Sequence, residues 1–278
     1  MKVRHPAWAG QFYPASVDLL KQEIASYLEL APSFDFSGRI VGIMSPHAGY
    51  VYSGRTAATA YKQIAGQTYE TVVIMAPSHS APIVGVSAYD GDYYESPLGR
   101  IPVDVEAVQQ LARRTDTIHV SGVGHDPMND GAEHSIEVQL PLIQSVIKDF
   151  SLVPLVFHDY NWDNCRLLGE AIAEVFDPKS VLVVASTDLY HGHSYEECQT
   201  SDESTLRAIE EKSAIDFCYG ANSDEYKACG AGPVTALKVA GEKWGLKPPK
   251  VIAQTNSADV TGAKGGYVVG YAAAVLEE

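Results

Sequence analysis

The chain has 278 residues, of which 46% are hydrophobic and 20% charged, a balance that suits a folded protein and excludes a largely disordered one. Its formal net charge of -15 and isoelectric point near 4.9 argue against a nucleic-acid or anionic-membrane surface, because both would repel the protein. No apolar run reaches the roughly 18–20 residues of a membrane span, and the N-terminus lacks the apolar core of a secretory signal, so we expect a cytoplasmic protein.

Predicted helices and strands alternate along the chain. In chain order we predict a helix over 16–30, a strand over 39–44, a helix over 53–64, a strand over 71–76, a hairpin over 86–104, a helix over 104–114, a strand over 151–157, a helix over 161–176, and strands over 180–186, 250–255 and 266–276. The strands show little polar alternation, which is typical of strands buried on both faces. We therefore predict an α/β fold with a mainly parallel central sheet, flanking helices and a hairpin excursion, with residues 1–278 forming a single domain.

The stretch "NDGAEHSIEVQLPLI" (129–143) predicts a further helix that begins at Asp130 or Gly131. Glu133, His134 and Glu137 would then lie in its first two turns, where acidic residues complement the helix dipole. We interpret Glu137 in this way. A histidine gains nothing from that dipole, so His134 is predicted to face a pocket as an acid, a base or a hydrogen-bond donor.

Polar side chains follow three of the predicted strands. His47 follows the first strand, His79 the second, and Asp188 and His191 come after the strand that ends at Ser186. In parallel sheets, the loops beyond the carboxyl ends of the strands gather side chains at one site. A single histidine in such a place is more often structural, but the coincidence of three strand ends favours a metal or catalytic role for His47 and His79.

Cys229 precedes "GAGP" and a predicted helix. A helix N-terminus favours the thiolate form of a cysteine, which makes it a better nucleophile and a better metal ligand. Cys165, Cys198 and Cys218 lie in helical patterns without such surroundings, and we interpret them as buried structural thiols.

Seven segments together carry a resemblance to a known family. They are "HPAWAGQFYP", "SPHAGYVYSG", "APSHS", "LGRIPVD", "EHSIEVQLP", "STDLYHGHS" and "CGAGP". In this order they resemble the successive blocks of the Memo family, the Memo module of the AmmeMemoRadiSam set. The resemblance implies a fold similar to the class III extradiol ring-cleaving dioxygenases, which hold non-haem Fe(II) with two histidines and a glutamate.

The resemblance also implies roles for individual residues. It makes His47 and His79 the imidazole ligands of a metal and puts Cys229 where the dioxygenases have a carboxylate. Asp188 and His191 would line the same pocket, with His134 beside the ligands or facing the substrate. A thiolate in place of a carboxylate shifts the metal preference toward copper or zinc, although iron remains an option. We expect iron or copper, with zinc as a further candidate.

Three functions follow as alternatives. In the first, the protein is a metal-dependent, dioxygenase-like oxidoreductase with an unknown substrate, in which His191 or His134 moves protons. In the second, the same pocket binds a peptide or small ligand without catalysis, as the resemblance to the eukaryotic Memo adaptor implies. A third is hydrolysis by Cys229 with His191 as its base. The resemblance further implies a functional association with the AMMECR-type and radical SAM proteins of the same set.

Overall fold

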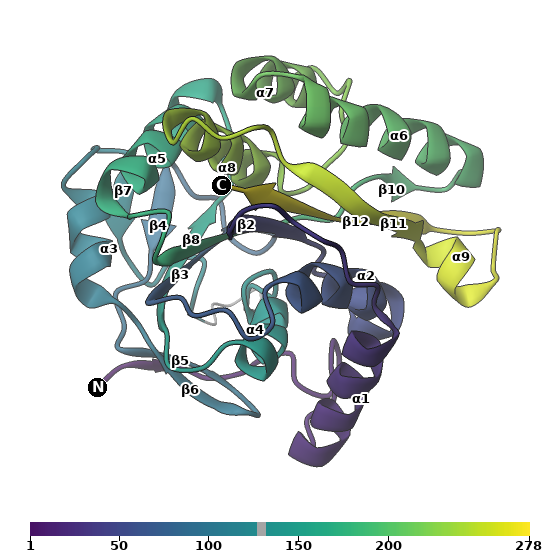
Figure 1. Cartoon of the computed structure of the whole chain (residues 1–278), viewed down its shortest axis with the longest axis horizontal. Helices are drawn as coiled ribbons and strands as arrows, with labels where there is room; N and C mark the ends of the chain where they lie inside the picture. The colour runs from purple at the N-terminus through teal and green to yellow at the C-terminus, as the bar shows by residue number, and fades with distance from the viewer. Residues whose placement is uncertain (127–131) are drawn as a thin grey trace.

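The computed structural model describes residues 1–126 and 132–278 and is built around a nine-stranded sheet (Figure 1). The strands of this sheet are β2 (Ile40–Ser45), β3 (Thr71–Pro77), β4 (Val86–Ala88), β7 (Ile118–Val120), β8 (Ser151–Phe157), β9 (Val181–Ser186), β10 (His191–Gly192), β11 (Lys250–Asn256) and β12 (Val268–Glu277). All the strands predicted from the sequence are present, with bounds that differ by at most two residues.

The centre of the sheet is parallel, and the strands that flank this centre, β12 and β4, run antiparallel to it. The spatial order is β10-β12-β2-β9-β3-β8-β4-β7, with β11 also paired to β12. β2, β9, β3 and β8 are parallel neighbours, whereas β12 runs antiparallel to β2, and β4 runs antiparallel to β8. Ser45 pairs with Ser186 and Met75 with Ala185, so the carboxyl ends of β2, β9 and β3 lie level. The predicted α/β fold with a central sheet is confirmed, with the parallel pairings concentrated at its centre.

A second, small sheet contains the predicted hairpin. β5 (Tyr93–Ser96) and β6 (Gly99–Pro102) form an antiparallel pair, and β1 (Val3–Arg4) adds to β5 in parallel. The turn places Gly99 at φ 126°, a backbone conformation that residues with a Cβ rarely adopt. Through this pairing, the β5–β6 hairpin joins the N-terminal segment to the rest of the fold.

Helices cover both faces of the large sheet (Figure 1). They are α1 (Val17–Leu30), α2 (Tyr50–Gln63), α3 (Val105–Ala112), α4 (Leu140–Val146), α5 (Trp162–Val175), α6 (Tyr195–Glu211), α7 (Ala214–Asn222), α8 (Ala231–Lys243) and α9 (Ser257–Thr261). α2 packs on β2, β11 and β12, while α8 packs on β3 and β9 and against α5. Within the described ranges, no helix is long and apolar enough to cross a membrane.

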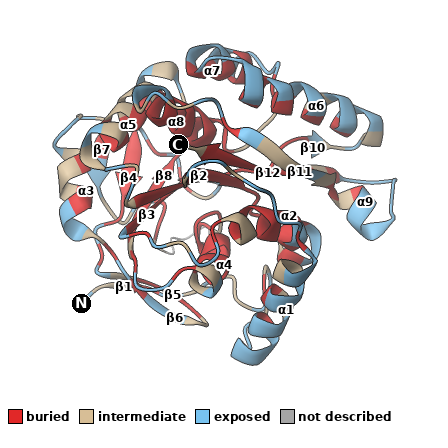
Figure 2. Ribbon diagram, viewed as in Figure 1, coloured by how far each residue is buried: buried red, intermediate tan, exposed pale blue. Residues whose placement is uncertain are grey.

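This layering explains the uniform apolar runs of the sequence. Every residue of β2, β3 and β9 is buried, and Figure 2 shows these strands in the buried class between exposed helix surfaces. Because neither face of these strands meets water, neither face selects for polar side chains. The helices predicted over 16–30, 53–64, 104–114 and 161–176 are present, with bounds that differ by at most three residues. At the start of α3, for example, the carboxylate of Asp104 accepts a hydrogen bond from the backbone amide of Ala107 at 3.0 Å.

The predicted helix over 129–143 differs from the structure. Its proposed first residues, Asp130 and Gly131, lie outside the described residues. Glu133 and His134 lie in a loop, a 3-10 turn spans Glu137–Gln139, and the α-helix begins only at Leu140. The carboxylate of Glu133 gives the physical reason, because it holds the chain in a loop by accepting hydrogen bonds from its own neighbours' amides.

Candidate metal centre

The candidate site lies at the level carboxyl ends of β2, β9 and β3. His47 stands two residues beyond β2, His79 two beyond β3, and Asp188 two beyond β9. His47 is buried, whereas the side chain of His79 is 37% exposed. The three loops thus form a partly open pocket at the place that the sequence indicates.

His47, His79 and Cys229 meet in this pocket. The Sγ of Cys229 lies 3.2 Å from the Nε2 of His47, and the ligand atoms of all three residues lie within 4.8 Å of one another. Typical zinc bond lengths place two nitrogens or a nitrogen and a sulfur on one ion roughly 3.3–3.6 Å apart. The group can therefore hold a metal ion after small movements of the side chains.

Ser186 fixes the tautomer of His47. Its hydroxyl donates its single hydrogen to the carbonyl oxygen of Ser135 at 2.8 Å and accepts from the Nε2 of Gln139 at 2.9 Å. Its contact of 2.8 Å with the Nδ1 of His47 must then be an N–H donated by the imidazole. Burial, followed by the neighbouring histidines, holds the pKa of His47 well below its usual range. The ring is neutral, and its Nε2 lone pair faces Cys229.

Glu133 orients the imidazole of His79 by accepting a hydrogen bond from its Nδ1. Its carboxylate accepts from the Nδ1 of His79 at 3.0 Å and from the backbone amides of His79, His134 and Ser135. Burial favours the neutral acid, but the hydrogen bonds and charge of His79 outweigh it and lower the pKa of Glu133 to about 2. An ionised carboxylate can only accept, so the Nδ1 of His79 carries hydrogen and its Nε2 is left for a metal.

Cys229 reaches the pocket through a close backbone contact. Its amide donates to the carbonyl oxygen of Asp188 at 3.2 Å, and its Sγ accepts from the amide of Asp188 at 3.2 Å. A Cβ on Gly230 would lie 2.2 Å from the carbonyl oxygen of Ser186, so only glycine lets the backbone before α8 approach the end of β9 this closely. The glycine next to Cys229 in the sequence therefore has a steric role.

The sequence-based expectation for the Cys229 thiol is wrong in direction. Its position before α8 predicts a favoured thiolate, yet burial raises the pKa of the Cys229 thiol, and the hydrogen bond with His79 offsets this only in part. Burial lowers the pKa of His79, but the Cys229 sulfur and the Glu133 carboxylate outweigh burial and raise that pKa to about 10. In the metal-free protein the pair thus retains a proton at neutral pH.

Asp188 and His191 complete the side of the pocket formed by β9. The Oδ1 of Asp188 accepts from the backbone amide of His47 at 2.8 Å, so it holds the loop rather than an imidazole ring. Burial raises the pKa of Asp188 to about 7, and the His47 amide limits the rise. The Nδ1 of His191 donates to the carbonyl oxygen of Leu189 at 2.9 Å, and burial lowers its pKa. Its Nε2 is therefore available as a proton acceptor.

The chain is similar to known proteins over nearly its whole length. A family model described as a Memo-like protein matches residues 4–275. The chain belongs to the Memo family. A MEMO1 family protein from Aeropyrum pernix is 35% identical over 285 residues, covering 98% of this chain and 99% of that protein. Another, from Nitrosopumilus maritimus, is 31% identical over 276 residues, covering 98% of each chain.

The solved structures add a likeness of fold alone. An uncharacterized protein from Escherichia coli K12 matches with a TM-score of 0.51 at 13% identity, over 84% of this chain and 99% of that one. At this level of identity the match concerns the arrangement of helices and strands and carries no information about activity.

In this Memo-family protein, His134 faces the pocket beside the ligand group, although it lies on a loop rather than on a helix. Its ring stacks on that of His79 with centroids 4.7 Å apart, and lies 5.4 Å from the ring of His47. Burial, together with the nearby His79, lowers the pKa of His134 to about 4. Phe12 and Trp8 pack against its other side, with ring centroids 4.6 and 6.0 Å away.

Glu137 holds this N-terminal segment in place. It forms a fully buried ion pair with Arg4 and also accepts from the amide of Trp8 at 2.8 Å and from the hydroxyl of Tyr13 at 2.6 Å. The interpretation of Glu137 as a partner of the helix dipole is therefore wrong. Arg4 also donates to the carbonyl oxygen of Glu133 at 2.7 Å, which connects this ion pair to the residue that orients His79.

The remaining cysteines agree with their predicted structural role. Cys165, Cys198 and Cys218 are buried, and none of them belongs to the ligand group around His47. The roles of Glu133, Trp8 and Phe12 in the site are not predicted by the sequence. The segment "HPAWAGQFYP" marked the aromatic pair only as part of the family resemblance, and nothing near Glu133 in the sequence indicates contact with His79.

Proposed function

We propose that the protein is a metal-dependent oxidoreductase of the dioxygenase-like kind. His47 and His79 would bind the metal through their Nε2 atoms and Cys229 through its Sγ. The observation that carries the proposal is the orientation of both imidazole rings, because Ser186 and Glu133 occupy the Nδ1 atoms and leave the two Nε2 atoms for a metal, which would displace the proton that His79 holds in its absence.

The donor set bears on the choice of metal. Imidazole suits iron, copper and zinc alike, whereas thiolate favours copper and zinc over harder ions. Three protein donors leave positions open for water, dioxygen or a substrate, as in other catalytic metal sites. When bound, iron or copper would supply redox chemistry and zinc would supply only Lewis acidity. We propose iron or copper as the resident metal on this basis.

Protons would be handled by the groups around the ligands. His191 and His134 are favoured in their neutral forms, so each can accept a proton from a substrate. Asp188, with its pKa raised to about 7, can hold or release a proton at the working pH and also keeps the His47 loop in place. We assign these three residues to catalysis.

A second candidate function is ligand binding without catalysis. The aromatic rings of Trp8 and Phe12 lie beside His134, and the side chain of His79 is partly exposed. Such a surface suits a small molecule or a peptide with an apolar group.

Anaerobic metal loading followed by dioxygen uptake distinguishes the two functions. We expect about one iron or copper per chain, and dioxygen consumption with catechol-like or other candidate substrates. His47→Gln should abolish both, whereas His119→Gln, an exposed histidine on β7 at the far edge of the sheet, should change neither. Stoichiometric metal without dioxygen uptake on any substrate would favour the binding function, and a wild-type chain that takes up no metal would refute the metal site.

Glu133 provides a test of how the site is oriented. Glu133→Gln should weaken metal binding roughly 10–100-fold, because an amide cannot accept all the hydrogen bonds that the carboxylate receives from His79 and the loop. Affinity would be measured by competition with a chromophoric chelator. Glu203→Gln, an exposed acid on α6, is the matched control. Unchanged affinity in a folded Glu133→Gln variant would contradict the role assigned to Glu133.

A further inference from the structure

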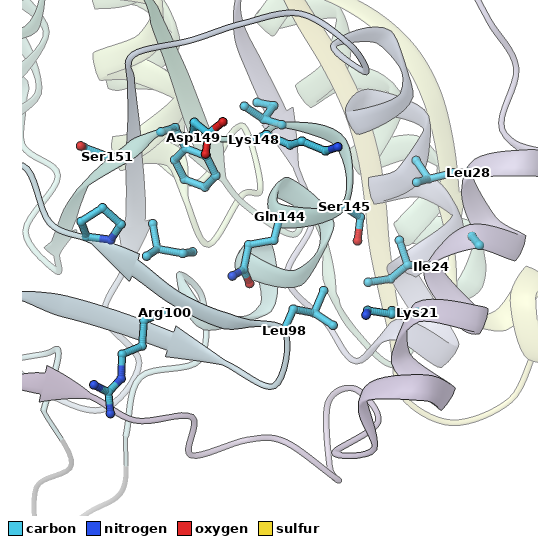
Figure 3. A pocket seen from close by; sticks show the side chains of 15 residues that line it. Lys21, Ile24, Leu28, Leu98, Arg100, Gln144, Ser145, Lys148, Asp149 and Ser151 are labelled. Carbon is cyan, nitrogen blue, oxygen red and sulfur yellow. The ribbon is translucent and has the colours of Figure 1, made fainter.

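A groove lies at the opposite end of the sheet from the candidate metal centre. It is bounded by α1, the hairpin strand β6 and the segment that follows α4, and it reaches Ser151, the first residue of β8 (Figure 3). Its volume is about 800 Å³. The carboxyl end of β8 lies with the metal-binding loops, so the groove is a separate feature of the molecule.

The floor of the groove is apolar. Ile24, Ile101 and Ile147 line it and are almost fully buried, with Leu28 and Leu98 half-buried above them. A concave apolar surface beside polar groups is typical of sites that bind small molecules, which generally have volumes of roughly 300–1,000 Å³. The groove has the volume of such a site.

Positive charge gathers at the groove although the whole protein is strongly acidic. Lys21, Arg100 and Lys148 line it, against Asp149 as the single acid in the lining. Arg100 is paired with Glu95 at 2.9 Å. Lys21 and Lys148 form no ion pair with any residue in the described part of the chain. In a chain with a net charge of -15, two exposed and unpaired ammonium groups at one groove favour an anionic ligand.

Hydrogen-bonding groups lie between the two lysines. Figure 3 shows Gln144 and Ser145 between Lys21 and Lys148. One amide hydrogen of Gln144 is donated to the carbonyl oxygen of Gly99 at 3.1 Å, which leaves the other for a ligand. The hydroxyl of Ser145 donates to the carbonyl oxygen of Pro141 at 2.8 Å and keeps its acceptor sites.

We propose that this groove binds a small organic anion with an apolar body, such as a carboxylate or sulfonate. Lys21 and Lys148 would pair with the anionic group, with Gln144 as an additional donor, and the apolar body would pack on the half-buried side chains of Leu28 and Leu98. The ligand is anionic because Lys21 and Lys148 outnumber Asp149 among the groups of the lining that form no ion pair within the described residues, and small because the volume matches one small molecule rather than a folded partner.

Fluorescence titration with 8-anilinonaphthalene-1-sulfonate tests the proposal, since this dye is a small sulfonate with an apolar body. Lys21→Gln and Lys148→Gln should each weaken its binding roughly two- to fivefold, as expected for exposed ion pairs. Ala25→Glu should weaken binding further, because it places a carboxylate in the groove from an exposed position of α1. Because Ala25 is exposed, this substitution should leave the protein folded, so weaker dye binding would not result from unfolding.

Two control variants make the same changes of charge at positions outside the groove lining. Ser26→Glu, on the next position of α1 and outside the groove lining, and Lys247→Gln, after α8, should bind the dye like the wild type. Equal affinity in Ala25→Glu and wild type would overturn the proposal. Equal or tighter groove binding of the neutral N-phenyl-1-naphthylamine would remove the preference for anions. If a decaglutamate peptide displaced the dye from the wild type but not from Lys148→Gln, the result would contradict a small ligand and favour an acidic peptide segment as the occupant of the groove.

Discussion

Replacing Glu137 by alanine should lower the free energy of unfolding by about 3–5 kcal/mol, the range expected when one partner of a buried ion pair is removed. Arg4 and Glu137 have side chains that are 1% and 0% exposed, so the guanidinium would be left in the interior without its counterion. The amide of Trp8 and the hydroxyl of Tyr13 would lose their acceptor as well. Urea unfolding followed by circular dichroism would measure the effect.

The control for this prediction is a solvent-exposed ion pair on the surface of the protein. Glu203→Ala removes the partner of Arg207 on α6, where both side chains are more than 60% exposed, and should cost less than about 1 kcal/mol. A loss below about 1 kcal/mol for Glu137→Ala as well would show that the N-terminal segment is held by other contacts.

Cys229→Ser should weaken metal binding by more than the roughly 10–100-fold expected for Glu133→Gln, because it replaces a proposed ligand rather than the partner of one. The loss should be greatest for copper, which prefers soft sulfur donors, and Cys229→Glu should shift the site toward Fe(II) by completing a set of two histidines and a carboxylate. In the wild type, bound metal should protect Cys229 from alkylation and a chelator should restore labelling.

Mass spectrometry of alkylated protein measures this protection residue by residue. Cys165, Cys198 and Cys218 are buried outside the ligand group, so their slow labelling should not depend on metal, and they serve as internal controls. Equal labelling of Cys229 with and without metal would remove it from the metal site.

The affinity for metal should rise with pH between 6 and 8. The raised pKa values of His79 and Cys229 mean that the pair holds at least one proton in this range, and a metal ion must displace it. Binding then releases protons, so the affinity should rise about tenfold per pH unit for each proton released. The slope should be smaller in Cys229→Ser, which lacks the thiol proton. A wild-type affinity independent of pH would contradict the proposed ligands.

Local patterns in the sequence predicted most of the fold because the central strands are buried on both faces. Uniform apolar runs such as the one at Val181–Ser186 have few alternatives to a buried strand, and parallel neighbours place His47, His79 and Asp188 at one edge. The antiparallel flanks formed by β12 and β4 have similar apolar patterns, so their direction was not visible in the sequence.

The rest of the site depends on contacts between residues far apart in the chain. Glu133 orients His79 across 54 positions of the sequence, and Glu137 pairs with Arg4 across 133. The periodic pattern of apolar residues contains no information about either contact. The same acidic residues satisfied a simpler local explanation as helix-dipole partners. For Cys229 the local explanation failed for another reason, because the burial that raises the pKa of its thiol is not visible from its position before a helix.

The hydroxyl of Ser186 also restricts what His47 can do. With its hydrogen given to Ser135 and its acceptor sites filled by Gln139 and His47, it has no capacity to take a proton from the imidazole. Reversing the tautomer of His47 would break several buried hydrogen bonds at once. His47 is thus fixed in one protonation form and does not take part in proton transfer, so that acid–base steps fall to the other titratable groups of the pocket, Asp188, His134 and His191.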